Sequence, residues 1–303
     1  MAPASVECMA SAQLEMPGMP RRLFPATPSK LATFTDCPRR YRHAYLDRPT
    51  PPKGPAWAHN SVGSAVHAAL RSWWELPVRE RTAAAARQLL YGVWSPAGFR
   101  DADQSARWRS RAAGWLTDYV TGLDPAEEPV GTERQVAATT ERLALSGRVD
   151  RIDQRGDELV VVDYKTGRVP STEDQARGSA ALAAYVLGVR RTLRRPCSRV
   201  ELHHLPSGTV AAFEHSDRSL ANHVRRAEDT AEDIERATEA LRAGEDADTA
   251  FPAVPGRQCG WCDFRSSCAP GRAAGPQPET WSFLAADDDV TRDGAGEGGA
   301  GEG

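Results

Sequence analysis

The sequence predicts an α/β protein with a helical first half, then a mixed sheet flanked by helices, and then a C-terminal cysteine cluster. Three observations support this order. Apolar residues recur at helical spacing before Gly131, whereas short β-branched runs separated by tight turns dominate after it. Three cysteines then lie within residues 259–268, which indicates a compact C-terminal segment held together through its thiols.

Length and composition limit the protein class. The chain has 303 residues, enough for one large domain or two small ones, and its 40% hydrophobic content suits a globular protein. No apolar run approaches the roughly 20 residues of a membrane span, and residues 1–20 lack a signal-peptide pattern. Six cysteines are too few for a disulfide scaffold. We therefore expect thiol or metal chemistry, no membrane contact and a cytoplasmic location.

The net charge of −3 weakly disfavours nucleic-acid binding, but the charge is unevenly distributed. Residues 287–303 carry six acids and one base, so residues 1–286 carry about +2. The chain has 35 arginines and only three lysines. Either a GC-rich genome or a need to bind phosphate bidentately explains that bias.

The first half is expected to be almost wholly helical. Residues 1–27 are rich in Pro, Met and Ala without a period, which predicts a loose N-terminal arm. A helix is predicted over Ser29–Tyr45 with Ser29 as its N-cap. Ser61–Trp74 has the spacing of a buried helix, and Arg79–Trp94 and Asp103–Leu123 are further helices.

The second half alternates strands and helices. Strands are predicted over 133–138, 143–153, 158–165, 199–205 and 209–215, and helices over 172–194 and 217–243. A tight turn at Arg155-Gly156-Asp157 joins the second and third strands. The cysteine segment spans 251–272, and residues 273–303 are expected to form a disordered, acidic, Gly-rich tail.

Polar residues at the tip of one apolar strand form the first candidate site. Four apolar residues run into Asp163-Tyr164-Lys165, and strand alternation puts Asp163 and Lys165 on one face. Pairing across the turn brings Asp150 near Asp163. The two carboxylates could hold a hard divalent cation, and Lys165 could orient a water or stabilise transition-state charge. The plainer interpretation is a strand end with salt-bridged polar residues.

Asp150, Asp163 and Lys165 in this spacing resemble the PD-(D/E)XK nucleases, specifically the RecB-like exonuclease branch. The resemblance covers residues 28–272 and implies a restriction-endonuclease-like α/β fold. It implies Mg²⁺- or Mn²⁺-dependent hydrolysis of DNA, most often as an exonuclease in DNA repair or recombination. It also implies that His67 is a third metal ligand with Asp150 and Asp163, whereas a histidine on an apolar helix is otherwise usually a core residue.

One position departs from that family. The branch has Gln four residues before a Tyr on the helix after the lysine strand. Tyr185 matches the Tyr and is implied to contact DNA, but position 181 is Ala, and Gln175 lies ten residues before Tyr185. The departure bears on substrate contact rather than on metal binding. Glu133, on the preceding strand, either assists a water or second metal or is a strand-edge charge.

The second candidate site is the C-x2-C-x5-C group of Cys259, Cys262 and Cys268. With Cys37 as a fourth ligand, the group suits either tetrahedral zinc or a cubane cluster, and spacing alone does not choose between them. A subset of RecB-like nucleases of the AddB type has one early Cys and this later group. The resemblance therefore implies a structural [4Fe-4S] cluster on Cys37, Cys259, Cys262 and Cys268.

Two aromatic residues near these cysteines, and the two other cysteines of the chain, are expected to have structural roles. Trp261 and Phe264 are expected to pack over the cluster and shield it from water. Cys8 and Cys197 lack ligand-like neighbours and are expected to be structural or incidental.

Nucleic-acid contact is predicted beside Cys37, where Arg39, Arg40 and Tyr41 form a basic and aromatic strip. No Gly-x-x-x-x-Gly-Lys-Ser/Thr loop is present, so the chain is not itself an ATP-driven helicase. The resemblance implies DNA as substrate and a helicase subunit as a partner. The alternative function is a non-catalytic DNA-binding or scaffolding module that keeps a nuclease fold.

Overall fold

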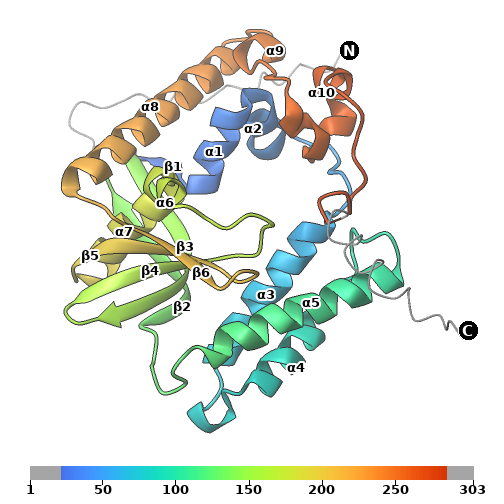
Figure 1. Cartoon of the computed structure of the whole chain (residues 1–303). Helices are drawn as coiled ribbons and strands as arrows, with labels where there is room; N and C mark the ends of the chain where they lie inside the picture. Colours follow the sequence, from blue (N-terminus) through green and yellow to red (C-terminus); the bar gives the residue numbers. More distant parts are fainter. Residues whose placement is uncertain (1–21, 285–303) are drawn as a thin grey trace, which may run out of the picture.

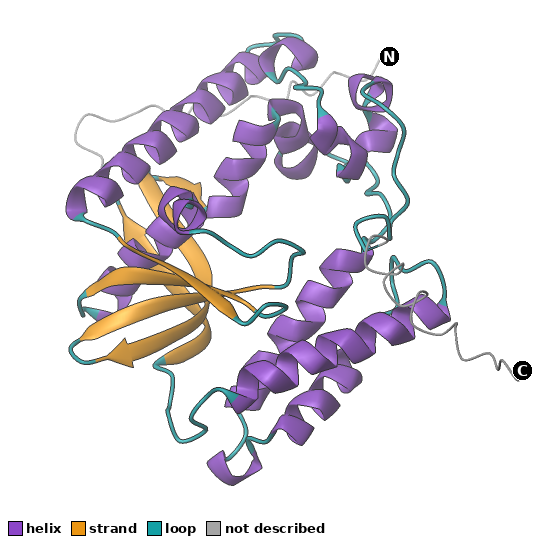
Figure 2. Ribbon diagram, in the orientation of Figure 1, coloured by secondary structure: helices purple, strands orange, loops and turns teal. Residues whose placement is uncertain are grey.

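The computed structural model describes residues 22–284, which form a six-stranded mixed sheet flanked by helices (Figures 1 and 2). The predicted fold class is confirmed. Cys8, most of the expected N-terminal arm and the acidic residues 287–303 lie outside the described residues. Within residues 22–284, every helix is too short or too polar to cross a membrane.

Strand β3 organises the sheet. The strands are β1 (Phe24–Ala26), β2 (Gly131–Thr139), β3 (Leu143–Arg155), β4 (Glu158–Lys165), β5 (Cys197–His204) and β6 (Thr209–Glu214). β3 pairs antiparallel with β2 and β4, and its first residues pair in parallel with β1. β4 and β5 are parallel, joined by α6 (Glu173–Gly178) and α7 (Ala180–Leu193), and β5–β6 is a hairpin.

Strand β4 is buried on both faces. Val160, Val162 and Tyr164 pack against α3 (Ala58–Trp74), α4 (Ala83–Val93) and α5 (Ala102–Thr121). Leu159 and Val161 pack on the opposite side, in a core that α7 completes. Burial on both faces explains why β4 has a nearly continuous apolar sequence, so that polar residues at its tip are exceptional.

The first two helices and the elements after β6 lie side by side beyond the sheet (Figure 1). There α1 (Pro28–Asp36) and α2 (Pro38–Tyr45) share a core with α8 (Asp217–Arg242). The C-terminal elements follow: α9 (Ala247–Ala250), two 3-10 turns (Arg257–Trp261 and Arg265–Ser267) and α10 (Ala269–Ala273). The Arg39 amide donates to the Pro252 carbonyl, which ties α2 to the C-terminal segment. A third 3-10 turn, Val78–Glu80, precedes α4.

Two predicted helices are each split by a capping residue. Ser29–Tyr45 breaks at Cys37, because the residue before Pro38 is held extended, and Thr27 rather than Ser29 caps α1. The helix over 172–194 breaks at Ser179, whose hydroxyl accepts from the Leu182 amide. The sequence signals for these breaks are Pro38 for the first and Gly178-Ser179 for the second, since Pro disfavours helical backbone at the residue before it, Gly often ends helices, and Ser caps them.

Both expected loose ends are partly ordered. Residues 24–26 form β1 within the segment expected to be an arm; three residues containing a proline gave no strand signal. Leu284, in the expected tail, is 5% exposed and packs into the core of α3 and α5. The fold therefore extends beyond both sides of residues 28–272.

Candidate functional site

Three carboxylates lie in a row across three neighbouring strands. In the β2–β3 ladder, the pairs before and after this position are Thr132 with Arg151 and Arg134 with Val149. They place Glu133 of β2 opposite Asp150 of β3. The β3–β4 register, continued by one residue, places Asp150 opposite Asp163. The predicted closeness of Asp150 and Asp163 therefore follows from the register, and Glu133 joins them from the other side.

His67 reaches this row from α3. Its Nδ1 lies 3.4 Å from Asp150 Oδ1, and its Nε2 lies 3.2 Å from the Tyr164 carbonyl oxygen. An Nε2–H that donates to this carbonyl leaves Nδ1 as the free ligand atom. In residues 22–284, His67, Glu133 and Asp150 form the one trio of acidic, histidine or cysteine residues whose ligand atoms all lie within 4.8 Å of one another. Two carboxylates and an imidazole fit a divalent cation such as Mg²⁺ or Mn²⁺.

Asp163 and Lys165 form a pair beside this trio. Lys165 Nζ lies 2.6 Å from Asp163 Oδ2, with Asp163 largely buried and the Lys165 side chain 45% exposed. Burial and the charge of Asp150 raise the pKa of Asp163, against the pull of Lys165. Joint metal binding by His67, Asp150 and Asp163 stays a prediction, while the trio adds Glu133 as a ligand candidate.

Asp150 is fixed by the backbone. Its Oδ2 accepts from the Tyr164 amide at 2.8 Å, at the point where the β3–β4 ladder ends. Its Oδ1 faces His67. The strand thus orients one carboxylate oxygen and leaves the other for a cation.

The pKa shifts of Glu133 and His67 reflect burial and crowded negative charge. Burial and then Asp150 raise the pKa of Glu133. Burial works to lower the pKa of His67, but its bond to Asp150 and the nearby carboxylates raise it overall. A divalent cation would relieve this repulsion, which is a second sign that the residues fit a metal.

Glu133 has a strained backbone, with φ at +46°, in the left-handed region that non-glycine residues rarely occupy. Such a conformation costs about 1–3 kcal/mol and is often retained where function requires it. The strain interrupts the β2 ladder at the residue that faces Asp150. A strand-edge charge needs no such backbone, so the geometry favours a role in the site. The sequence carries no signal for this dihedral.

Tyr185 lies beside the carboxylates, on α7. Burial, together with Asp163 and the other carboxylates, raises the pKa of Tyr185 to about 12, so its phenol is neutral. A Cβ at Gly147 would lie 2.5 Å from Tyr185 Cε1, which explains the glycine three residues before Asp150. Gln175 caps α6 in a capping box with Thr172 and is thereby committed to structure.

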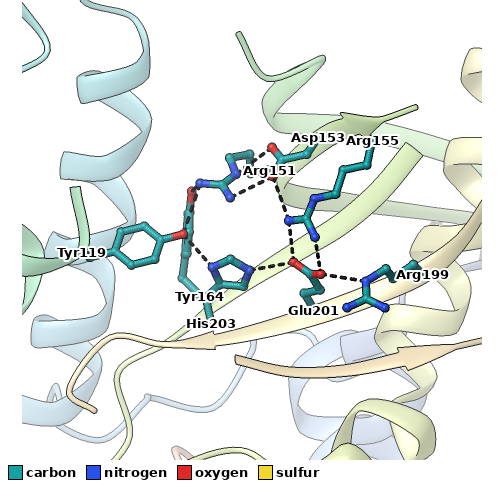
Figure 3. Close-up of polar contacts among 8 residues, drawn as sticks. All are labelled: Tyr119, Arg151, Asp153, Arg155, Tyr164, Arg199, Glu201 and His203. Atoms are coloured by element: carbon teal, nitrogen blue, oxygen red, sulfur yellow. Dashed lines mark hydrogen bonds and ion pairs between the residues drawn. The ribbon is translucent and has the colours of Figure 1, made fainter. Parts of the chain in front are cut away.

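A polar network behind the strands was not foreseen (Figure 3). Arg151 pairs with Asp153 at 2.8 Å and donates to the Tyr164 hydroxyl at 3.3 Å. The Tyr119 hydroxyl bonds the His203 ring at 2.8 Å, and that ring bonds Glu201 at 3.0 Å. Glu201 also accepts hydrogen bonds from the guanidinium groups of Arg155 and Arg199. The network joins α5 to β3, β4 and β5 on the face of β4 that carries Tyr164, opposite the face that carries Asp163 and Lys165. Polar residues two apart, at 151 and 153 and at 201 and 203, were the available sequence signal.

The four predicted cysteine ligands line one small cavity of about 30 Å³. Cys37 Sγ accepts from the Val254 amide at 3.5 Å, and Cys268 Sγ accepts from the Gly271 amide at 3.4 Å. All five cysteines of the described chain are free thiols. Cys197 is buried in β5, as expected of a structural residue. We call the space lined by Cys37, Cys259, Cys262 and Cys268 the cysteine cavity.

The predicted basic and aromatic strip is largely internal, and this corrects the prediction for Arg39 and Tyr41. Tyr41 is 2% exposed and packs between aromatic neighbours, so it cannot reach DNA. The Arg39 guanidinium is buried and pairs with Asp248 at 2.9 Å. Arg40 remains 30% exposed and lines the cysteine cavity.

The two aromatic residues expected to shield the cluster differ. Phe264 is 2% exposed and lines the cysteine cavity, as predicted. Trp261 is 40% exposed and lines a different cavity, so its predicted shielding role is wrong.

Comparisons with known proteins give the family. The crystal structure of a putative exonuclease from Eubacterium rectale aligns with a TM-score of 0.44 and 11% identity, covering 88% of this chain and 92% of that chain. The structure of SSO0001 aligns with a TM-score of 0.33 and 17% identity, covering 81% and 85%. The curated proteins include no match to the sequence. The family model of the PD-(D/E)XK nuclease superfamily matches residues 25–269, which include every residue of the carboxylate row. The chain therefore belongs to the PD-(D/E)XK nuclease superfamily.

Proposed function

We propose that this nuclease is a metal-dependent deoxyribonuclease that degrades DNA from an end, in repair or recombination. The observation that carries the proposal is the trio of His67, Glu133 and Asp150 beside the Asp163–Lys165 pair. These five residues, which we call the carboxylate site, combine oxygen and imidazole ligands with an exposed ammonium group. A solvated strand end would need neither the imidazole nor the strained Glu133.

A bound Mg²⁺ or Mn²⁺ would lower the pKa of a water and neutralise charge on the scissile phosphate. His67, Glu133 and Asp150 would hold it, and Asp163 could contribute its second carboxylate oxygen. Lys165 is held by Asp163, with its ammonium group open to solvent. It would orient the attacking water and stabilise negative charge as it develops on the phosphate oxygens. Tyr185, neutral at physiological pH, can donate a hydrogen bond to the substrate backbone.

We also propose that the cysteine cavity holds a [4Fe-4S] cluster. In residues 22–284, no three of these sulfurs lie within 4.8 Å of one another. Tetrahedral zinc, with Zn–S bonds of about 2.3 Å, would hold its sulfurs at roughly 3.8 Å. No three of the four sulfurs are that close, which argues against tetrahedral zinc. The cytoplasm would keep the thiols reduced.

The alternative is a non-catalytic DNA-binding module. Its support is Ala181 in place of the family Gln, with Gln175 used as a helix cap. Activity that requires a separate helicase chain is a further proposal, suggested by the missing ATP-binding loop.

The test is cleavage by anaerobically purified protein, with and without Mg²⁺ or Mn²⁺. Linear end-labelled DNA and a closed circle of the same sequence are compared, each single- and double-stranded. Metal-dependent loss of the linear form alone would establish an exonuclease, and loss of the circle would show endonuclease action. Asp150→Asn should abolish cleavage, whereas Lys53→Ala, a loop lysine elsewhere, should leave it unchanged. Cleavage that persists in Asp150→Asn would refute the proposal.

The cluster is tested on the same preparation. Iron and acid-labile sulfide near four per chain, with absorbance near 400 nm, would support it. One zinc per chain without that absorbance would contradict it.

A further inference from the structure

A second cavity begins at Thr166, the residue after Lys165, and has no part in the proposed metal chemistry. Its volume is about 640 Å³, within the range of small-molecule sites. It opens between α3, α5, the chain after β4 and the C-terminal segment. Its aromatic lining comprises Trp108, Trp115, Trp261, Phe283 and His59. We call it the aromatic cavity.

The aromatic cavity is lined by residues that directly follow β4, the strand that carries Asp163 and Lys165. Thr166 and Gly167, which line it, follow Lys165 in the chain. A Cβ at Gly63 of α3 would lie 3.3 Å from Thr166 Oγ1, so helix and strand tip are in close contact there. His59 is two turns of α3 before His67, on the same face. A strand that leaves the carboxylate site along α3 therefore passes this cavity.

Two of the aromatic residues are unusually exposed. Trp261 is 40% exposed and Phe283 is 41% exposed, and their rings meet edge to face at 5.5 Å. Phe283 also contacts His59 edge to face, at 5.1 Å between ring centroids. Exposed aromatic rings at a cavity mouth offer flat faces on which a planar ligand can stack.

The charges around the cavity suit an anion. Its polar lining includes Arg111 and Arg168, and among residues 22–284 no acidic side chain lines it. Arg168 is exposed and has no ion pair within residues 22–284, while the Arg111 guanidinium lies 4.9 Å from the Trp108 ring centre. Cations beside aromatic faces match a ligand that combines a phosphate with a planar ring.

We propose that the aromatic cavity is a base-stacking subsite for unpaired nucleotides of the DNA strand held at the carboxylate site. This inference rests on the proposed function and names its substrate form. Stacking is available only to bases outside a duplex, so the subsite selects single-stranded ends. Trp261, between Cys259 and Cys262, links the position of this stacking face to the cysteine cavity.

The test measures binding without metal, so that cleavage has no influence. Fluorescence anisotropy compares a single-stranded oligonucleotide with an abasic strand of equal length and charge, both in EDTA. We expect wild type to bind the base-containing strand at least roughly 5-fold more tightly, from one stacked base. Phe283→Ala and Trp261→Leu should remove most of that preference. Arg168→Ala should weaken binding of both probes and lower the salt dependence by about one charge.

Tyr91→Ala is the matched control, because Tyr91 is 41% exposed on α4 and lies outside the cavity lining. Equal binding of both strands by wild type would overturn the proposal, as would a preference that survives both cavity variants. A preference that appears only when Asp287, Asp288 and Asp289 are changed to Asn would make this acidic segment the occupant, and would also overturn it. Base preference without cleavage would support the subsite and contradict the nuclease; cleavage without preference would do the reverse.

Discussion

The carboxylate site and the cysteine cavity are both candidate metal sites, but the fold builds them differently. Most of the carboxylate site lies on adjacent strands within residues 133–165, whose register places the side chains. The cysteine cavity joins Cys37 to a segment more than 200 residues later, without any shared strand. The first site depends mainly on the pairing of neighbouring strands, and the second on the docking of two distant segments.

This difference suits the carboxylate site to catalysis and the cysteine cavity to stabilising the fold. Hard oxygen ligands on a sheet would hold an exchangeable cation next to a solvent-exposed lysine. A metal group bound by the four thiols would tie distant segments together and so remove entropy from the unfolded chain. We therefore expect changes in the carboxylate site to affect activity more than stability, and changes in the cysteine cavity to do the opposite.

The largest expected effect is on activity. Lys165→Ala should lower kcat by roughly 10²–10³-fold, since it removes charge stabilisation without removing a ligand of the trio. Mn²⁺ affinity, measured by calorimetry, should change little, and the melting temperature should stay near that of wild type. Loss of Mn²⁺ binding in Lys165→Ala would show that the lysine acts through the ligands instead.

The second effect is on stability. Cys268→Ser should remove the absorbance near 400 nm and lower the melting temperature by several degrees, because the two chain ends lose their link. Cys197→Ser is the control, since Cys197 lies in β5 and does not line the cavity, so this variant should keep the absorbance. Thermal melting followed by circular dichroism gives the comparison. An unchanged spectrum in Cys268→Ser would remove Cys268 from the ligand set.

The third effect is a pH dependence of the carboxylate site. The pKa values of Glu133, Asp163 and His67 are all raised, so these groups keep their protons to a higher pH than usual. A cation must displace those protons, and Mn²⁺ affinity should therefore fall as the pH is lowered from about 8 to 6. Titration calorimetry in buffers of different ionisation enthalpy would count the protons released. A Kd independent of pH would contradict the shifts, while the absorbance of the cysteine cavity should stay constant over this range.

The smallest effect concerns the network behind the strands. Tyr119→Phe removes the hydrogen bonds to His203 and Arg151, and should reduce the free energy of unfolding by about 1 kcal/mol. Urea unfolding measures the change, with Tyr91→Phe on the surface as control. If Tyr119→Phe instead abolishes cleavage at unchanged stability, the network would belong to the catalytic machinery.

Local patterns were sufficient for the sheet and for the residues on it. Continuous apolar sequence predicted β4, and the tight turn before it fixed the register that brings Asp150 near Asp163. Strand alternation alone put Asp163 and Lys165 on one face, where they pair at 2.6 Å. These predictions succeeded because each depends on residues that are close in sequence.

Other features depended on distant contacts. The burial of Tyr41 and the pairing of Arg39 with Asp248 follow from α2 docking on the C-terminal segment, which no local pattern encodes. The left-handed backbone at Glu133 arises where β2 meets the row of carboxylates. Such a conformation is stabilised by its surroundings and leaves no mark in composition or periodicity.

The sequence by itself determined the strand register, the carboxylates with their lysine, and the spacing of the cysteines, because periodicity and short turns specify them. Only the tertiary structure decided that Glu133 completes the trio with His67, that Tyr41 is buried, and that Trp261 turns outward. Each of these depends on which surfaces pack together. Packing depends on many weak contacts between segments far apart in the chain. The sequence of any one segment therefore does not reveal how it packs.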